Sequence, residues 1–276
     1  MHYRQNNTAA ELYQNQYGYL ASFNSNGFSL GVNSGEGINN TAGNYVAWQW
    51  KGATSNTTNT TGGLTSVIRV NQTAGFSVVT YTGNGSSSQT IGHGLGTTPS
   101  MIIVKGRTGG AGNTNWMVYN KNLNGGTNPA QYYLMMNSDA AQGGLSSVWQ
   151  DTAPTSTVFS VGSSSETNYN GHTYVAYCWA EIPGFSKFGS YSGNSTSNGP
   201  FLYTGFKPKY VMIKRIDSSA GSWDIADTSR DTYNPVGKWL FANLNDAEDN
   251  EVVLYDYLSN GFKLRNNGSG TNASGG

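Results

Sequence analysis

The sequence has almost no cysteine. Cys178 is the only one among 276 residues, so no disulfide can form within the chain, and the small secreted folds that depend on disulfides are excluded. Cys178 lies in the apolar stretch 173–179, where a thiol is most simply a small buried hydrophobe. The three histidines are scattered along the chain. The spacing of a zinc site is therefore absent, and we expect no metal ligands.

Charged residues are also scarce. They make up 11% of the chain, and the 15 basic and 15 acidic residues cancel. This balance gives no electrostatic footprint for nucleic acid or for an anionic membrane. No run of about 18 apolar residues occurs, so no membrane insertion is expected. The first stretch, "MHYRQNNTAAELY", lacks the apolar core of a secretory signal. We therefore expect the protein to be made in the cytoplasm.

Small polar residues and aromatic residues are abundant instead. The chain has 37 glycines together with many Asn, Ser and Thr, and aromatic residues reach 13%. Disordered chains lack aromatics, so disorder is a poor explanation. Short stretches such as "SMIIVKG", "NWMVYNK" and "TYVAYCWA" are rich in β-branched and aromatic residues and are bounded by turn residues. This pattern predicts an all-β fold of antiparallel β-sandwiches with few or no helices.

The sequence contains an internal repeat of about 105 residues. "FSVVTYTGNGSSSQTIGHGLGTTPSMIIVK" (76–105) matches "FSKFGSYSGNSTSNGPFLYTGFKPKYVMIK" (185–214), and Trp116 and Trp223 follow at corresponding positions. Further on, "TVFSVGSSSETNYNG" (157–171) matches "NGFKLRNNGSGTNASG" (260–275). The chain is therefore predicted to contain almost three copies of one repeat unit.

These matches predict the domain organisation. Residues 1–50 resemble the second half of a unit, and residues 51–75 resemble a linker with one short strand. Residues 76–182 form a complete β-sandwich repeat. Residues 184–276 form another that lacks its last strand. The second and third units are joined only by "EIPG" (181–184), so we expect them to be tightly coupled.

The strand absent from the last unit is recognisable elsewhere. "TYVAYCW" (173–179) closes the complete unit, and "NYVAWQW" (44–50) closes the first partial one. The third copy would begin just past residue 276. A sheet without one buried strand leaves unpaired N–H and C=O groups. We expect either a longer parent chain or a strand donated by a neighbouring subunit. Trp50, Trp179, Phe159 and Phe262 are predicted core residues.

No constellation of residues predicts catalysis. His93 stands in "GHGLG", but the matching stretch of the next unit, "PFLYTGF", has no histidine, which favours a turn residue. The loops "TGNG" and "SGNS" lack the lysine of a phosphate-binding loop and read as hairpin turns. No paired carboxylates stand in a recognisable context. We therefore expect no enzyme, no catalytic residues and no cofactor.

Aromatic residues that flank loops are the remaining candidates for a site. Tyrosine stacks on sugar faces and anchors protein interfaces. The candidates for surface contact are Tyr119, Tyr132, Tyr169 and Tyr191. The competing reading is that they are ordinary strand aromatics that cover the sandwich.

Four stretches carry a resemblance to a known family: "VVTYTGNGSSSQTIGHGLGTTPSMIIVKGR", "PTSTVFSVG", "YVAYCWAEIPGFSKFGSYSGN" and "FLYTGFKPKYVMIKR". The chain resembles, over nearly its whole length, a tandem β-repeat family of tailed-phage virion and tail-fibre-like structural proteins from marine and aquatic phages. One departure is Gln49, which stands where the family often has Cys. That cysteine is therefore not essential.

The resemblance implies a structural protein of the virion exterior that is made in the host cytoplasm. A tail or head fibre engaged in host attachment is the first reading. Its partners would be other virion proteins, copies of itself and a host glycan or protein receptor. A capsid decoration or cement protein is one alternative, and a bacterial surface adhesin or carbohydrate-binding module is another. A polysaccharide-degrading tailspike would need paired carboxylates in a groove.

Overall fold

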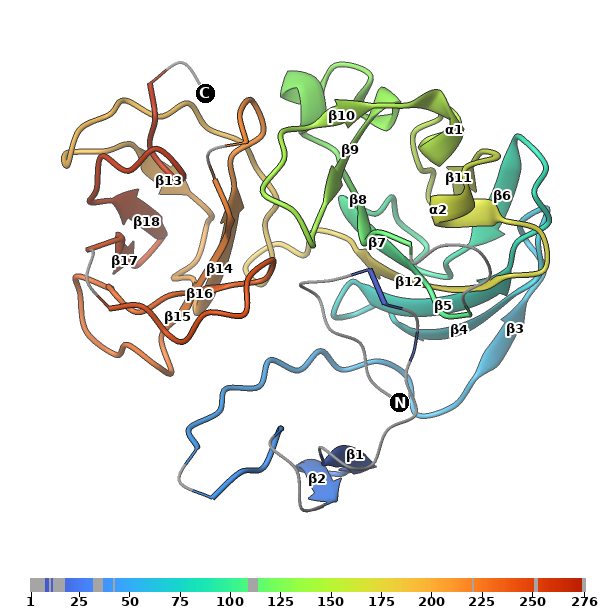
Figure 1. The fold of residues 1–276 in the computed structure, drawn as a ribbon, viewed down its shortest axis with the longest axis horizontal. Coiled ribbons are helices and arrows are strands. Elements are labelled where there is room, and N and C mark those ends of the chain that lie inside the picture. The colour runs from blue at the N-terminus through green and yellow to red at the C-terminus, as the bar shows by residue number, and fades with distance from the viewer. Residues whose placement is uncertain are drawn as a thin grey trace.

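The structure is a computed structural model that consists almost entirely of β-strands. It describes residues 8–9, 11, 18–31, 37–41, 43–108, 114–219, 221–250 and 253–274. Its helical turns are α1 (Ser146–Trp149), α2 (Ser165–Asn168), η1 (Leu123–Gly126) and η2 (Pro129–Gln131). The predicted all-β fold with few helices is confirmed. Figure 1 shows two β lobes side by side, with a small hairpin apart from both.

The larger lobe, here called the first sandwich, is built on an eight-stranded antiparallel sheet. The strands run in the order β10-β9-β8-β7-β12-β5-β4-β3. Their bounds are β3 (Thr57–Asn59), β4 (Ser66–Asn71), β5 (Phe76–Thr82), β7 (Met101–Gly106), β8 (Met117–Asn120), β9 (Tyr132–Met135), β10 (Gly143–Gly144) and β12 (Thr173–Trp179). The apolar phrase 173–179 thus forms β12, which pairs with β5 on one edge and with β7 on the other.

A second layer covers one face of this sheet. It consists of β6 (Gln89–Gly92) paired antiparallel with β11 (Val158–Val161). Phe159 and Cys178 lie in the core between the layers, and their exposed fractions are 1% and 0%. The prediction that both are buried is confirmed. Burial raises the pKa of the Cys178 thiol well above its usual value, which keeps the thiol protonated and unreactive.

The smaller lobe, here called the second sandwich, contains two three-stranded antiparallel sheets in the orders β14-β15-β16 and β13-β18-β17. The strand bounds are β13 (Phe201–Tyr203), β14 (Tyr210–Lys214), β15 (Trp223–Asp227), β16 (Leu240–Phe241), β17 (Tyr255–Leu258) and β18 (Gly261–Leu264). Val211, Tyr255 and Leu264 form its core together with Phe262, for which the core prediction is confirmed.

The two sandwiches share a continuous apolar interface. Met101 and Val118 of the first sandwich and Trp223 and Ile225 of the second belong to one buried cluster. The Trp223 indole Nε1 also donates a hydrogen bond to the Met135 carbonyl at 2.9 Å. Apolar burial of this kind resists relative motion of the two lobes. The expected tight coupling of the two units is thus present in the packing.

Matching side-chain hydrogen bonds recur in the two sandwiches. The buried Asn168 accepts a bond from the Asn84 backbone N–H at 2.9 Å and donates to the Ser86 and Gly162 carbonyls at 2.7 and 3.0 Å. Asn272 accepts from the Asn194 backbone N–H at 2.9 Å. It also donates to the Thr196 and Asn266 carbonyls at 2.8 and 2.6 Å. We call each arrangement an asparagine clasp, because one buried amide joins the two halves of a unit.

Two further devices follow the repeat. The Asn137 side-chain oxygen accepts a bond from the Trp116 N–H at 2.9 Å, and Asn243 does the same for Trp223 at 2.8 Å. The Tyr81 hydroxyl donates to the Thr167 carbonyl, and the Tyr191 hydroxyl donates to the Thr271 carbonyl. Residues at corresponding positions of the repeat therefore make equivalent hydrogen bonds in the two sandwiches.

The sheets differ at one edge. In the first sandwich, β7 lies between β8 and β12. In the second sandwich, the corresponding strand β14 pairs with β15, and no strand among the described residues pairs with its other edge. The division of the chain drawn from the repeats stays a prediction. The structure adds that β3 and β4, from the stretch 51–75, belong to the large sheet.

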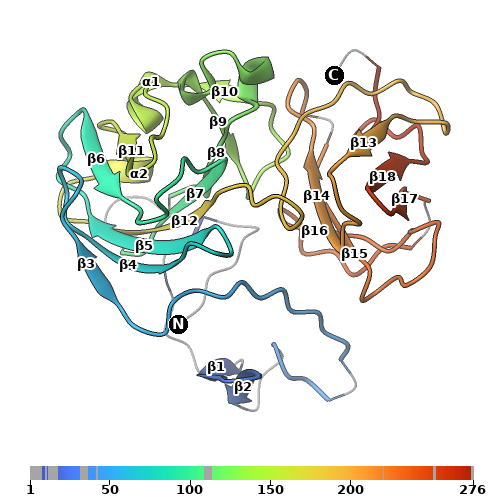
Figure 2. The same ribbon diagram turned by 180° about the vertical axis from the view of Figure 1, so that it is seen from behind.

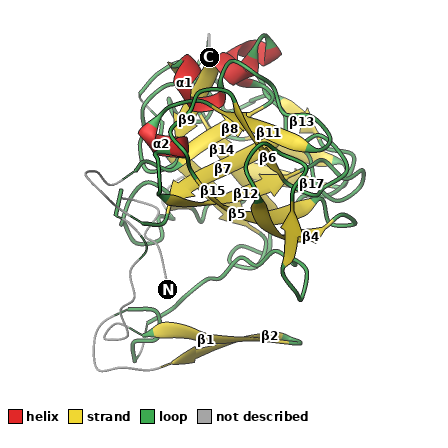
Figure 3. Cartoon of the chain, turned by 90° about the vertical axis from the view of Figure 1, so that its right-hand side faces the viewer, coloured by secondary structure: helices red, strands yellow, loops and turns green. Residues whose placement is uncertain are grey.

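The N-terminal hairpin is formed by β1 (Tyr19–Asn24) and β2 (Gly27–Gly31). Figures 1 and 3 show it apart from both sandwiches. The chain then runs below both sandwiches towards β3, as the blue trace in Figures 1 and 2 shows. In this stretch, residues 44–50 form no strand, and Trp50 is 44% exposed. The prediction that Trp50 is a core residue is therefore wrong, because its copy of the strand is not paired on both edges as β12 is with β5 and β7. Trp179, also a predicted core residue, is half-buried against the apolar cluster between the sandwiches.

Candidate interaction site

The candidate site lies where residues 44–50, here called the N-terminal stretch, meet the second sandwich. Strand β15 ends at Asp227, a residue that is 3% exposed. Its Oδ1 accepts hydrogen bonds from the Ser229 and Arg230 backbone N–H groups at 2.9 and 3.0 Å. Aspartate bonds of this kind fold the chain into a tight turn. The turn brings the Arg230 side chain back onto the end of the strand that precedes it.

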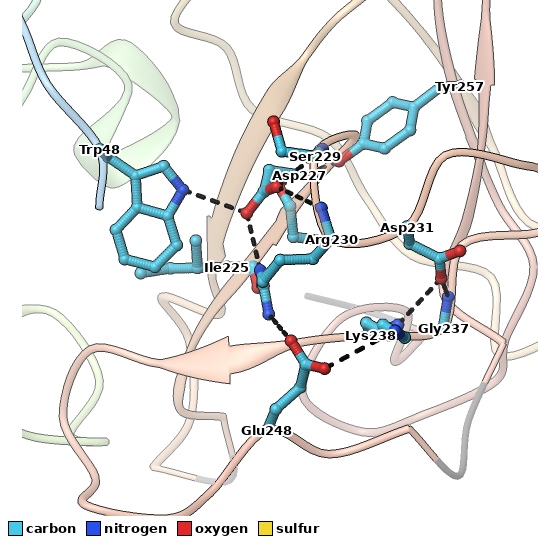
Figure 4. Close-up of polar contacts among 11 residues, drawn as sticks. Trp48, Ile225, Asp227, Ser229, Arg230, Asp231, Gly237, Lys238, Glu248 and Tyr257 are labelled. Atoms are coloured by element: carbon cyan, nitrogen blue, oxygen red, sulfur yellow. Dashed lines mark hydrogen bonds and ion pairs between the residues drawn. The ribbon is translucent and has the colours of Figure 1, made fainter. Parts of the chain in front are cut away.

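All three nitrogen atoms of the Arg230 guanidinium donate hydrogen bonds. Its Nε donates to Asp227 Oδ2 at 2.7 Å, its Nη1 to Glu248 Oε2 at 2.9 Å, and its Nη2 to the Ile225 carbonyl at 3.0 Å. Figure 4 shows the guanidinium between the two carboxylates. Charge-assisted bonds to two carboxylates fix the plane of the guanidinium. The turn after β15 is thereby tied to the loop that carries Glu248.

Trp48 joins this ion pair from the N-terminal stretch. Its indole Nε1 donates to Asp227 Oδ2 at 3.1 Å, and the Arg230 guanidinium lies 5.7 Å from the centre of its ring. Figure 4 shows the Trp48 indole to the left of Asp227, with Glu248 below the Arg230 guanidinium. Cation–π attraction and the hydrogen bond act on the same side chain. We call Trp48, Asp227, Arg230 and Glu248 the tryptophan clamp.

The electrostatics of the clamp favour an ionised Asp227. Burial alone raises the pKa of this carboxyl, but the hydrogen bonds and charge of Arg230 and the bond from Trp48 outweigh burial, so the pKa lies below its usual value. Both oxygens of Asp227 accept bonds already. A saturated pair of this kind is suited to holding a segment in place. It offers no proton to a substrate, and we assign it no catalytic role.

A second tryptophan of the same stretch lies at the junction of the two sandwiches. The ring of Trp50 packs edge-on against Trp179 of β12 and against Tyr210 of β14, with centroids 5.9 Å apart in both cases. Trp48 also packs edge-on against Tyr210, at 5.8 Å. Edge-to-face pairs at such separations are favourable beyond the area they bury. The two tryptophans therefore hold residues 48–50 beside the end of β14.

The four tyrosines predicted for surface contact do not form one site. Tyr119 is 3% exposed and packs edge-on against Trp149 of α1, so it cannot contact a partner, and its prediction is corrected. Tyr132 is half-buried beside the interface of the sandwiches. Tyr191 is half-buried, and its hydroxyl is bonded to Thr271. Only Tyr169, which is 49% exposed and packs on His172, lies open to solvent.

The described residues contain no group of three or more His, Cys, Asp or Glu side chains that could hold a metal ion. His93 is fully buried; its Nδ1 accepts a hydrogen bond from the Leu95 backbone N–H, and its Nε2 donates to the Thr155 carbonyl. Burial lowers the pKa of this imidazole below its usual value. Within the described part of the chain, no helix is long and apolar enough to cross a membrane.

Fold and site together define a repeat protein of tandem antiparallel β-sandwiches whose N-terminal stretch is clamped onto its last module. Residues 2–276 match the model of a family described as "Domain of unknown function (DUF7483)", and the chain belongs to this family. No curated protein matches the chain. No solved structure matches it either.

The clamp leads to a first prediction. We expect Trp48→Phe and Asp227→Asn to show a coupling energy of about 1–2 kcal/mol in a double-mutant cycle, because the bond between them ends on a charged group. Urea denaturation of the four proteins measures it. The matched control pairs Trp50→Phe with Asp227→Asn, where no hydrogen bond joins the side chains. A coupling below about 0.5 kcal/mol for the Trp48 pair would show that this contact does not hold the stretch.

Proposed function

We propose that this chain is a structural building block of a phage virion, and that it forms part of a tail or head fibre engaged in host attachment. The resemblance of its repeat phrases to virion proteins supports the proposal. The observation that carries it structurally is the continuous apolar interface of Met101, Val118, Trp223 and Ile225. A rigid tandem of sandwiches is a suitable segment of a stalk or arm.

Exposed aromatic side chains support a role in attachment. On β13, Phe201 and Tyr203 are 44% and 68% exposed, and Tyr233 is 82% exposed. Planar aromatic faces that stand open to water stack on sugar rings and anchor protein partners. A carbohydrate-binding module is therefore the second candidate function. The same exposed aromatic side chains would serve the fibre proposed above, since a fibre that attaches to a host needs a receptor-binding face.

The location of the protein tests the proposal. We expect antibodies raised against the purified chain to label a tail or head appendage of intact particles in immunogold electron microscopy. Antibodies against the major capsid protein serve as the control for particle integrity. Uniform labelling of the shell would favour a capsid decoration protein instead. A protein present in infected lysate but absent from purified particles would refute a structural role.

Binding to host cells tests the second candidate separately. We expect the purified chain to bind cells of the host and Tyr203→Ala with Phe201→Ala to lower that binding at least ten-fold. Tyr233→Ala, which removes a still more exposed ring from outside β13, is the control. Unchanged binding by the β13 variant would exclude this strand as the receptor face.

A further inference from the structure

The open edge of β14 is the feature that carries a further inference. In the first sandwich, β12 pairs with β7 from Tyr174 opposite Gly106 to Trp179 opposite Met101. Strand β14 corresponds to β7 in the repeat, because "PSMIIVK" (99–105) matches "PKYVMIK" (208–214). An unpaired sheet edge leaves N–H and C=O groups without strand partners. The edge of β14 is thus a site for an added strand.

Residues 45–50 have the sequence of that strand. "YVAWQW" (45–50) and "YVAYCW" (174–179) share four of six letters, including the tryptophan at the end. Residues 45–50 are in no strand of this structure, and four of the six are exposed. The chain therefore contains a second copy of the β12 phrase that is not paired with any sheet in the described part of the molecule.

The repeat also predicts the register of the added strand. Trp179 lies opposite Met101 and Tyr177 opposite Ile103. Transferred to the second sandwich, this register places Trp50 opposite Tyr210 and Trp48 opposite Met212. Opposite and diagonal side chains touch across paired strands. Both rings already touch Tyr210, at 5.9 Å for Trp50 and 5.8 Å for Trp48. These contacts are those of an opposite and a diagonal neighbour.

The side chains that would face the core also match. In this register Gln49 takes the place of Cys178, which is 0% exposed in the first sandwich. The core that Gln49 would enter is more polar, because Asp224 stands where the first sandwich has Met117, and Asp224 is 2% exposed. A buried amide needs hydrogen-bonding partners, and a carboxyl group can provide one. Gln49 in place of Cys178 thus occurs together with Asp224 in place of Met117, so both the added strand and the core are more polar than in the first sandwich.

We propose that residues 45–50 bind the open edge of β14 in the same chain and form the fourth strand of its sheet. The tryptophan clamp already holds residues 45–50 beside β14. What we propose in addition is a set of backbone hydrogen bonds between this segment and the open edge of β14. The same chain is the favoured source because Trp48 already bonds Asp227 of its own second sandwich. A tethered segment also has a high effective concentration. The inference stands independently of the virion role.

Hydrogen exchange of the wild-type protein gives the first test. In an edge strand, alternate backbone N–H groups point away from the sheet and exchange freely, whereas a paired strand protects them. We expect both sets of amides in β14 to be protected. We expect Trp48→Ala with Trp50→Ala to speed exchange of the outward set at least ten-fold and to leave the set bonded to β15 unchanged. Fast exchange of the outward amides in the wild-type protein would overturn the proposal.

A cross-link tests register and source together. We expect Val46→Cys with Lys214→Cys to form a disulfide on mild oxidation, because these positions correspond to the opposite pair Val175 and Lys105. Val46→Cys with Met212→Cys, which is displaced by two residues, is the matched control. Non-reducing electrophoresis and mass spectrometry identify the product. A cross-link within one chain supports the proposal, whereas cross-linked dimers or equal reaction of the displaced pair overturn it.

Discussion

We expect Asn168→Ala to lower the free energy of unfolding by roughly 3–5 kcal/mol. The Asn168 side chain is 0% exposed. Its amide donates to the Ser86 and Gly162 carbonyls and accepts from the Asn84 N–H. Alanine removes every one of these bonds and leaves the Gly162 carbonyl, which belongs to a buried residue, without the Asn168 amide as its partner. Groups buried without a partner account for the large cost.

The repeat supplies a matched experiment for this asparagine clasp. Asn272→Ala removes the same set of bonds from the second sandwich and is expected to cost a similar amount. Asn170→Ala, an exposed asparagine two residues from the first clasp, is the control and should change stability by less than about 0.5 kcal/mol. Urea denaturation followed by circular dichroism measures all three. A loss below about 1 kcal/mol for Asn168→Ala would contradict a structural role for the clasp.

The strands were predictable because their signal is local. β12 is the clearest case, since the phrase "TYVAYCWAE" (173–181) predicts a buried strand, and the structure has a strand over Thr173–Trp179. The internal repeat extends this agreement to individual hydrogen bonds. Trp116 and Trp223 correspond in the repeat, and their backbone N–H groups donate to the side chains of Asn137 and Asn243 in the same way.

The burial of individual aromatics was less predictable. Trp50 and Trp179 end the same phrase, yet Trp50 is 44% exposed while Trp179 is half-buried. The sequence of a strand shows which residues it can bury, but burial itself depends on the strands that pair with it. Tyr119 shows the opposite error. It stands at a strand end, where exposure is common, and α1 covers it with Trp149.

The tryptophan clamp had no signal in the sequence, because Trp48 and Asp227 are separated by 179 residues. One partial indication was available. Asp227 occupies the repeat position of Asn120, and both side chains accept the N–H two residues further on, at 2.9 Å. The turn was therefore predictable from the repeat. The approach of the N-terminal stretch was not, because it depends on the tertiary arrangement.

We expect Asp224→Asn to stabilise the protein strongly at pH 7.5, less at pH 5 and little below pH 4. Asp224 lies in the core of the second sandwich, where burial raises the pKa of its carboxyl to about 7 and Lys214 only partly opposes the rise. In the unfolded chain the pKa is about 3.9. Between these values the folded protein holds a proton that the unfolded chain releases. The stability of the wild-type protein therefore falls as the pH rises from about 4 to about 7.

The expected size of this effect is roughly 3–4 kcal/mol, since each pKa unit corresponds to about 1.4 kcal/mol. His93, whose pKa is lowered by burial, acts with the opposite sign in this range. The measurement is therefore the difference between wild type and variant in urea denaturation at each pH, which cancels the His93 contribution. Asp224→Met, which restores the residue of the first sandwich, should reproduce the loss of pH dependence. A difference between wild type and Asp224→Asn that stays constant from pH 5 to 7.5 would show that the Asp224 carboxyl is ionised in the folded protein.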